Sequence, residues 1–241
     1  MVAHNFAVAI VLASGVVFAQ VVDLPRGANV LEVCELPKLA RANRALILWM
    51  INPQKHPWHD ENEPYTCPDE TRGSFYRGPA RVSLTNTVTK TIVNTVEIKT
   101  ELTGGWKDEL DIPYWIHRSY YRVDPPFKGA EGRPVILDLK DYNGDGKALE
   151  FALFDAHSCS ELQTQLIGYS ERRDRVIQFP IHVKGKHYDH NPGLLWLDRF
   201  LFQKPLRPGY WKYEISYNNG DNVEFTIRYN RAKEMFVGTV K

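Results

Sequence analysis

The amino-acid sequence predicts an all-β protein, an antiparallel β-sandwich or barrel with short helical insertions. Stretches rich in Val, Ile, Thr and Tyr alternate apolar and polar residues, the period of a half-buried strand. Helical spacing is confined to short stretches at 35–43 and 193–202. Prolines are spread along the chain and mark loops at 53–66, 124–134 and 204–209.

The clearest single element is a hairpin near the C-terminal end. Trp211, Tyr213, Ile215 and Tyr217 alternate with polar residues, and a second alternating run extends from 223 to 229. Between the two runs lies an Asn-Gly pair, which tolerates the positive φ that a tight hairpin turn demands. Residues 211–229 are therefore predicted to form two paired strands.

Other strands are predicted from shorter patterns. Residues 44–51 form an apolar run typical of a buried strand. Residues 80–99 show β-branched alternation, with a possible bend at 93–95, and Val82, Leu84 and Val88 share one parity, as in a strand with one buried face. Further apolar runs, the last of them interrupted by a proline that implies an edge or bulge, lie at 135–139, 149–154 and 176–183.

The N-terminal segment 1–19 is predicted to be a signal peptide. Phe6 to Ala19 carries no charge and ends in a small-x-small pattern before Gln20. The alternative is a buried N-terminal strand or helix, since the first five residues hold no Lys or Arg. No later segment is long and apolar enough for a transmembrane helix. We expect a secreted or periplasmic protein.

Two parts are expected after the signal peptide, an N-terminal disulfide-stapled β part at 20–103 and a β-sandwich part at 104–241. The Gly104-Gly105 loop supplies the boundary. The net charge is +1, so no basic face large enough to neutralise phosphates is expected, which argues against a nucleic-acid partner. Short basic runs at 172–173 and 184–186 are interpreted as solvated loop surface.

The three cysteines are Cys34, Cys67 and Cys159. In an oxidising compartment the natural pair is Cys34 with Cys67, since both lie in the N-terminal third. Three cysteines allow three pairings, and Cys159 is then left as a free thiol.

An acidic segment offers the most specific chemistry. Asp141, Asn143 and Asp145 place oxygen-bearing side chains at alternate positions, the spacing with which a loop wraps calcium. Gly146 permits a sharp turn. The Lys147 main-chain carbonyl and the Glu150 carboxylate are the further candidate ligands. The alternative is a plain hairpin turn, because Asn-Gly-Asp-Gly is also rich in turn residues.

The stretch from Asp141 to Lys147 resembles the D-x-[DN]-G-D-G calcium loops of FG-GAP/VCBS-type repeats, and less closely those of dockerins and EF-hands. Apolar runs on both sides favour the first of these. The resemblance covers about twenty residues. It implies a structural calcium ion. Two loop positions depart from these patterns. The ninth position, which is acidic in FG-GAP-type loops, is Leu149 here, and the twelfth, which is a bidentate glutamate in EF-hands, is Ala152.

Two histidine-rich loops are candidates for a zinc site, one with His56 and His59, the other with His187 and His190. Their sequences lack the helical His-Glu-x-x-His pattern of zinc proteases, so ordinary polar loops are expected. Tryptophans and tyrosines crowd residues 106–121, where they fill a core or present a sugar-binding face.

Together these patterns predict a secreted, non-enzymatic β module with a structural calcium site and a protein or glycan partner. The alternatives are a secreted metal-dependent hydrolase that uses the histidine loops, and a purely structural envelope protein.

Overall fold

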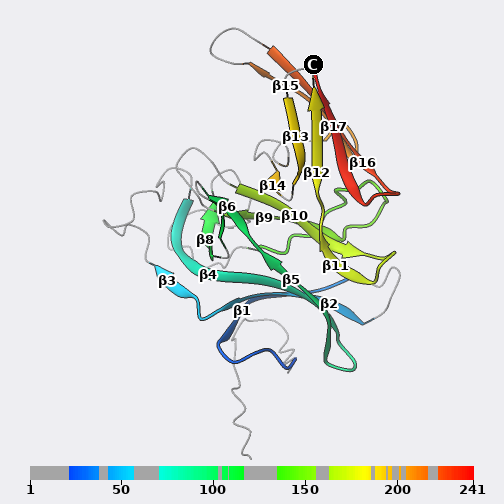
Figure 1. Cartoon of the computed structure of the whole chain (residues 1–241). Coiled ribbons are helices and arrows are strands. Elements are labelled where there is room, and N and C mark those ends of the chain that lie inside the picture. The colour runs from blue at the N-terminus through cyan, green and yellow to red at the C-terminus, as the bar shows by residue number, and fades with distance from the viewer. Residues whose placement is uncertain are drawn as a thin grey trace, which may run out of the picture.

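The computed structural model describes most of the chain beyond the N-terminal segment. The described residues are 22–37, 43–56, 71–102, 105–107, 109–116, 135–155, 163–185, 188–193, 195–196, 201, 205–216 and 222–241. Every named element among them is a β-strand, which confirms the all-β prediction (Figure 1). The strands form several mainly antiparallel sheets in a sandwich-like arrangement.

The first sheet has the strand order β1-β2-β4-β3, and both β5 and β8 also pair with β4. Its strands are β1 (Ala28–Glu35), β2 (Arg44–Ile51), β3 (Gln54–His56), β4 (Thr71–Asn86), β5 (Thr91–Ile98) and β8 (Glu109–Ile116). The buried strand predicted at 44–51 is therefore β2, and the predicted run at 80–99 becomes the end of β4 and β5. A separate two-stranded sheet joins β6 (Thr100–Leu102) to β7 (Gly105–Lys107).

The prediction of one buried face at the end of β4 is wrong, because both faces are covered. Val82 and Leu84 lie in the main core, but Ser83 and Thr85 on the other face are also fully buried. Ser83 accepts a 2.9 Å hydrogen bond from the Trp49 indole, and Thr85 donates its hydroxyl to a main-chain carbonyl. Hydroxyl groups can be buried there because each has a partner.

The second sheet has the order β11-β10-β14, with β9 paired to β10. Its strands are β9 (Glu150–Asp155), β10 (Gln163–Ser170), β11 (Arg175–Gln178) and β14 (Leu195–Trp196). β11 contacts β5 and β4 of the first sheet. Asn94 of β5 links the two sheets directly, since its amide donates to the Val176 carbonyl at 2.9 Å and accepts from the Val176 N–H at 3.0 Å.

The third sheet has the order β13-β12-β17-β16-β15. Its strands are β12 (Ile181–Gly185), β13 (Tyr188–Gly193), β15 (Tyr210–Ser216), β16 (Asn222–Asn230) and β17 (Met235–Val240). β15 and β16 pair antiparallel from Tyr210 to Ser216, which confirms the predicted C-terminal hairpin. The pairing of β12 with β17 is parallel.

The predicted run at 176–183 divides between two sheets. β11 ends at Gln178 and β12 begins at Ile181, so the chain leaves the second sheet and enters the third across Phe179 and Pro180. Proline has no N–H with which to hydrogen-bond to a neighbouring strand, so it is well placed where the chain leaves one sheet for another. Aromatic side chains fill the space beside the crossing, and they are Phe179, Trp196, Trp211, Tyr229 and Phe236.

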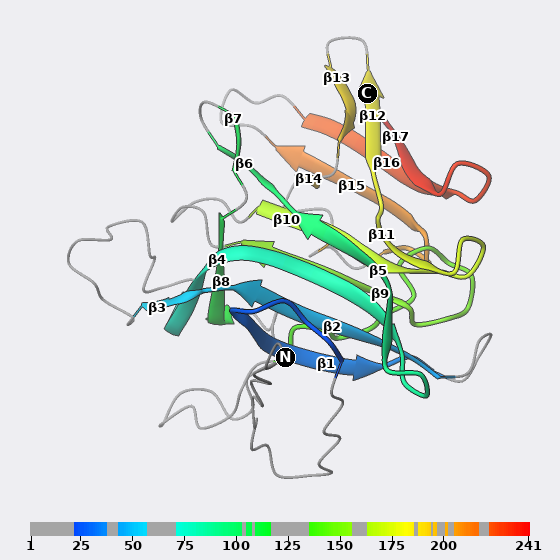
Figure 2. The ribbon, with the colours of Figure 1, turned by 60° about the horizontal axis from the view of Figure 1, so that its bottom comes forward.

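One hydrophobic core includes residues from all three of these sheets, from Leu31 to Phe236. Figures 1 and 2 show the second sheet between the first and the third. The boundary expected between 103 and 104 falls between β6 and β7, and β8 beyond it pairs with β4 before it. The division into two parts stays a prediction.

The apolar run at 135–139 is not a regular strand, contrary to the expectation of strands on both sides of the acidic loop. The segment makes only isolated bridges. Its N–H groups bond to a side chain instead, because the Glu32 carboxylate accepts from Ile136 at 2.7 Å and from Leu137 at 3.0 Å. A carboxylate from β1 therefore replaces the neighbouring strand that would otherwise satisfy these donors.

Candidate functional site

The acidic loop, residues 141–147, lies directly before β9. A bridge closes it, in which the Lys140 N–H donates to the Glu150 carbonyl at 2.7 Å and the Glu150 N–H donates to the Lys140 carbonyl at 3.2 Å. Within the loop, Gly144 and Gly146 have φ values of 76° and 88°. Glycine adopts this left-handed region without strain, which explains the Gly-Asp-Gly sequence at the sharpest part of the loop.

Asp141 organises the loop from its first position. Its Oδ1 accepts hydrogen bonds from the N–H groups of Gly144 at 2.7 Å and Asp145 at 3.1 Å. Its Oδ2 accepts from the Gly146 N–H at 3.0 Å. Bonds of this kind between an aspartate and the following backbone favour a tight turn.

Asn143 and Asp145 continue the same pattern. The Asn143 Oδ1 accepts from the Asp145 N–H at 2.8 Å, and the Asp145 Oδ1 accepts from the Lys147 N–H at 2.9 Å. The Asp145 N–H is thus shared by one oxygen of Asp141 and one of Asn143. Two of the ligand atoms expected from the sequence therefore lie against one nitrogen.

Glu150 lies beneath the loop and is fully buried. Its Oε2 accepts from the N–H groups of Tyr142 at 3.0 Å and Asn143 at 3.4 Å, and its Oε1 accepts from the Asn143 side-chain amide at 2.8 Å. Burial raises the pKa of Glu150 from 4.5 to about 9, against the two backbone hydrogen bonds and with the nearby charges of Asp145 and Asp141. Without a bound cation this carboxyl group therefore holds a proton at neutral pH.

The acidic loop is packed tightly on the turn that precedes β15. A Cβ atom at Gly144 would lie 2.5 Å from the main-chain carbonyl oxygen of Pro208. A Cβ atom at Gly209 would lie 2.6 Å from the main-chain carbonyl oxygen of Asn143. The Tyr142 ring stacks on Trp211, with centroids 6.5 Å apart and an interplanar angle of 15°. Nothing in the local sequence pattern of the loop indicates these partners, since they come from more than sixty residues later.

Lys147 was expected to contribute only its carbonyl, but its side chain has a structural role. The ammonium group pairs at 2.5 Å with Glu171, at the start of the turn between β10 and β11. Across the residues that the structure describes, no Lys or Arg forms an ion pair with Asp141, Asp145 or Glu150. The acidic groups of the loop are held by N–H donors rather than by cationic side chains.

All five candidate ligands lie in or next to this one loop, but they do not form a finished metal cage. Among the described residues, no group of three or more His, Cys, Asp or Glu side chains is arranged to hold a metal ion. The oxygen donors that come together are carboxylates and one amide, which are the groups that calcium prefers. The hydrogen bonds alone also close the loop, as the plain-turn alternative expects.

The remaining candidates are described only in part. Cys34 has a free thiol, and burial, followed by the charges of Glu32, Glu35 and Asp138, raises its pKa to about 11. Cys67 lies outside the described residues, so its disulfide with Cys34 stays a prediction. Cys159 and the signal peptide at 1–19 also lie outside the described residues, so the predictions made for them stay predictions. Of the histidine loops, His59 and His187 lie outside the described residues, and only the backbone of His56 and His190 is described, in β3 and β13.

The crowded aromatic segment at 106–121 is described only in part, as backbone in β7 and β8, with Leu110 and Ile112 buried. No helix in the described part of the chain has the length and apolar character needed to cross a membrane. Comparison with protein-family models, with curated proteins and with solved structures gives no match.

Proposed function

We propose that this chain is an exported, non-enzymatic β-sheet module in which the acidic loop binds a structural calcium ion. The single observation that carries the proposal is the convergence of Asp141 and Asn143 oxygens on the Asp145 N–H, at 3.1 and 2.8 Å, above the buried Glu150. In the proposed site the side chains of Asp141, Asn143, Asp145 and Glu150 and the Lys147 carbonyl would supply the oxygen ligands.

The charge balance of the loop supports a cation. Asp145 and Asp141 raise the pKa of Glu150 further, beyond the effect of its burial, because ionisation of Glu150 would bring a third negative charge next to theirs. A divalent ion would replace this repulsion by attraction and would favour the ionised form of Glu150.

The position of the loop suggests what the ion would do. The loop touches the Pro208–Gly209 turn, stacks on Trp211 of the third sheet, and reaches Glu171 beside the second. An ion in the loop would fix this junction rather than react with a substrate. We therefore propose a stabilising role for calcium and a binding role for the module, with a protein or glycan as partner.

The test is a thermal melt of the full chain, freed of metal with a chelator and then melted with and without about 10 mM calcium. For dissociation constants of about 0.1 to 1 mM, usual for extracellular calcium modules, the ion should stabilise the fold by about 1.4 to 2.7 kcal/mol. A chain of this size should then melt several degrees higher.

Asp145→Asn is the decisive variant, because an amide oxygen can still accept from the Lys147 N–H while the charge is lost. It should remove the calcium effect and leave a folded protein. Glu97→Gln is the matched control, since it removes a negative charge from an exposed side chain on β5. No calcium effect in the unaltered protein, or the same effect in Asp145→Asn, would refute the site.

A further inference from the structure

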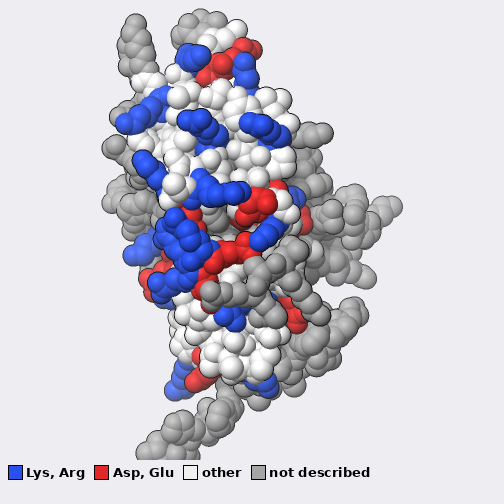
Figure 3. All heavy atoms as spheres, turned by 90° about the vertical axis from the view of Figure 1, so that its right-hand side faces the viewer, with Lys and Arg blue, Asp and Glu red and all other residues white. Residues whose placement is uncertain are grey.

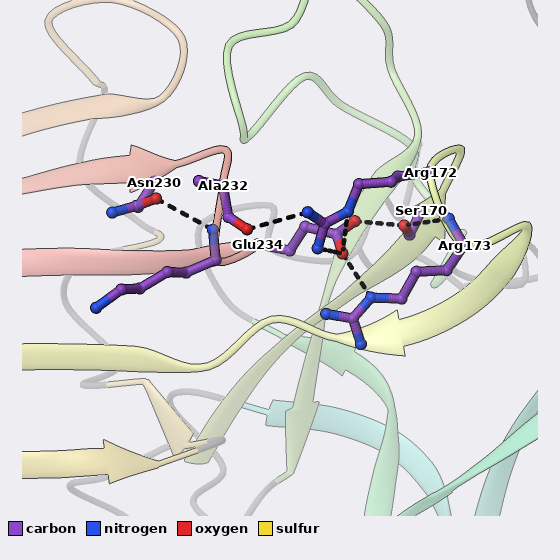
Figure 4. Close-up of polar contacts among 7 residues, drawn as sticks. Ser170, Arg172, Arg173, Asn230, Ala232 and Glu234 are labelled. Carbon is purple, nitrogen blue, oxygen red and sulfur yellow. Dashed lines mark hydrogen bonds and ion pairs between the residues drawn. The ribbon is translucent and has the colours of Figure 1, made fainter.

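Two turns from different sheets are joined at one side of the molecule. The first, residues 171–174, connects β10 to β11, and the second, residues 231–234, connects β16 to β17. We call them the paired turns. Figure 4 shows Arg172 and Arg173 of the first turn reaching the Glu234 carboxylate of the second. Arg172 also donates to the Ala232 carbonyl at 3.0 Å.

Glu234 is the buried link between the paired turns. Its Oε2 accepts from Arg172 at 3.1 and 2.6 Å and from Arg173 at 2.5 Å, and its Oε1 accepts from the Ser170 hydroxyl. Burial would raise the pKa of Glu234, but the hydrogen bonds from Ser170, Arg172 and Arg173 outweigh burial and lower it. The carboxylate is therefore ionised and directed inward.

The other two acids of the paired turns also face partners inside the fold. Glu171 pairs with Lys147 at 2.5 Å. Asp174 accepts from the Arg44 guanidinium at 3.2 and 2.9 Å and from the Tyr169 hydroxyl at 2.7 Å. All three negative charges of the paired turns are thus engaged by other side chains.

Three of the four positive side chains of the paired turns present charge to solvent, whereas the Arg172 guanidinium is bonded to Glu234 and Ala232. The side chains of Arg231 and Lys233 are exposed and make no ion pair or hydrogen bond within the described part of the chain. Arg173 uses only its Nε on Glu234, and about half of its side chain is exposed, 49%. Figure 3 shows Lys and Arg side chains over the centre and upper part of this side of the molecule, with Asp and Glu side chains among them at the centre.

We propose that the paired turns bind an anionic polysaccharide, with Arg173, Arg231 and Lys233 contacting its sulfate or carboxylate groups. This rests on the proposed function, which places the module outside the cell with a protein or glycan partner. Two projecting turns offer separate cationic contacts to a linear polyanion. The paired turns carry four basic and three acidic side chains, and all three acids are paired within the fold, so the charges that the turns present to a ligand are positive.

Arg172 and Arg173 are more than the solvated loop surface that the sequence predicts. Both side chains are about half exposed, but both also hold Glu234. The inward bonds fix the direction of the two arginines before any ligand arrives, and a prearranged guanidinium loses less conformational freedom on binding.

The experiment measures binding of the full-length chain to heparin, as a sulfated probe, and to polygalacturonate, as a carboxylate probe, over a series of salt concentrations. Binding to either probe is expected to weaken with salt, since it releases counterions. The double variant Arg231→Gln, Lys233→Gln should bind more weakly and reduce the slope of log Kd against log salt concentration by about 1 to 2.

The matched control is the double variant Arg26→Gln, Lys90→Gln, which removes two exposed positive charges beside the first sheet. It should bind as the unaltered protein does. Equal losses in both double variants, or stronger binding to duplex DNA or anionic vesicles than to both glycans, would overturn the proposal. Each measurement is made with calcium and with chelator. Glycan binding that persists without a calcium effect on melting would refute the calcium site alone.

Discussion

The Asn143 side chain donates a 2.8 Å hydrogen bond to Oε1 of Glu150, seven residues later and fully buried. This bond joins the middle of the acidic loop to the start of β9. It also makes Asn143 serve two purposes, since its Oδ1 faces the Asp145 N–H at 2.8 Å. The bond between Asn143 and Glu150 therefore couples the candidate calcium ligands to the core.

The first prediction concerns the pH dependence of the metal-free protein. The folded pKa of Glu150, about 9, lies above its ordinary value of 4.5, so its contribution to stability is complete below about pH 4.5 and is lost as the pH rises towards 9. In the presence of chelator, each rise of one pH unit between these two values should lower the free energy of unfolding by about 1.4 kcal/mol through Glu150. Urea unfolding from pH 5 to 8 measures this slope.

The comparison for this prediction is Glu150→Gln, which keeps an acceptor and a donor but cannot ionise. Its stability should fall less steeply with pH than that of the unaltered protein. Parallel curves for the two proteins would show that Glu150 does not change its protonation between the unfolded and folded states.

The second prediction concerns the contact between the acidic loop and the turn before β15. Gly144→Ala should destabilise the protein by about 1 to 3 kcal/mol more than Gly146→Ala. Both positions have positive φ, so both variants carry similar backbone strain. Only at Gly144 would the added Cβ meet an atom, the Pro208 oxygen at 2.5 Å, whereas nothing lies within 4 Å at Gly146. Chemical denaturation measures the free energy of unfolding of both variants. An equal loss of stability in the two would contradict the contact between Gly144 and Pro208.

The third prediction concerns the link between the first and second sheets. Asn94→Ala should cost roughly 1 to 3 kcal/mol, because the N–H and carbonyl of Val176 would lose their partner in a buried region. Asn29→Ala, at an exposed position on β1, should cost less than about 0.5 kcal/mol. Equilibrium unfolding measures both, and similar values for the two variants would mean that the Asn94 link does not hold the sheets.

The fourth prediction concerns the Cys34 thiol in reduced, folded protein. With its pKa raised from 9.0 to about 11, the fraction of thiolate at pH 8 falls about 100-fold, and alkylation by iodoacetamide should slow accordingly. Site-resolved mass spectrometry compares folded and urea-unfolded protein. Equal alkylation rates in the two states would contradict the effect of burial and of the neighbouring acids.

The sequence predicted those parts of the fold that depend on local alternation. The β15–β16 hairpin and β2 follow from apolar periodicity and turn residues. It could not predict that Ser83 and Thr85 are buried, because their partners, including Trp49, lie on neighbouring strands. The Glu32 bonds to Ile136 and Leu137 likewise join residues more than a hundred positions apart.

The candidate site also combines features that follow from local sequence with contacts between residues far apart in the chain. The spacing of Asp141, Asn143 and Asp145 predicted that their oxygens gather in one turn, because that arrangement is local. The packing on Pro208–Gly209 and the link from Arg172 and Arg173 to Glu234 depend on contacts between sheets. Local spacing carries no information about such contacts.

The most direct test of the calcium proposal is equilibrium dialysis of the chelator-treated protein against radioactive calcium at concentrations up to about 10 mM. We predict close to one ion per chain for the unaltered protein at saturation, and a large loss of bound ion in Asp145→Asn. Absence of bound calcium in the unaltered protein, or equal binding by Asp145→Asn, would contradict the account and leave the acidic loop as a turn closed by its own hydrogen bonds.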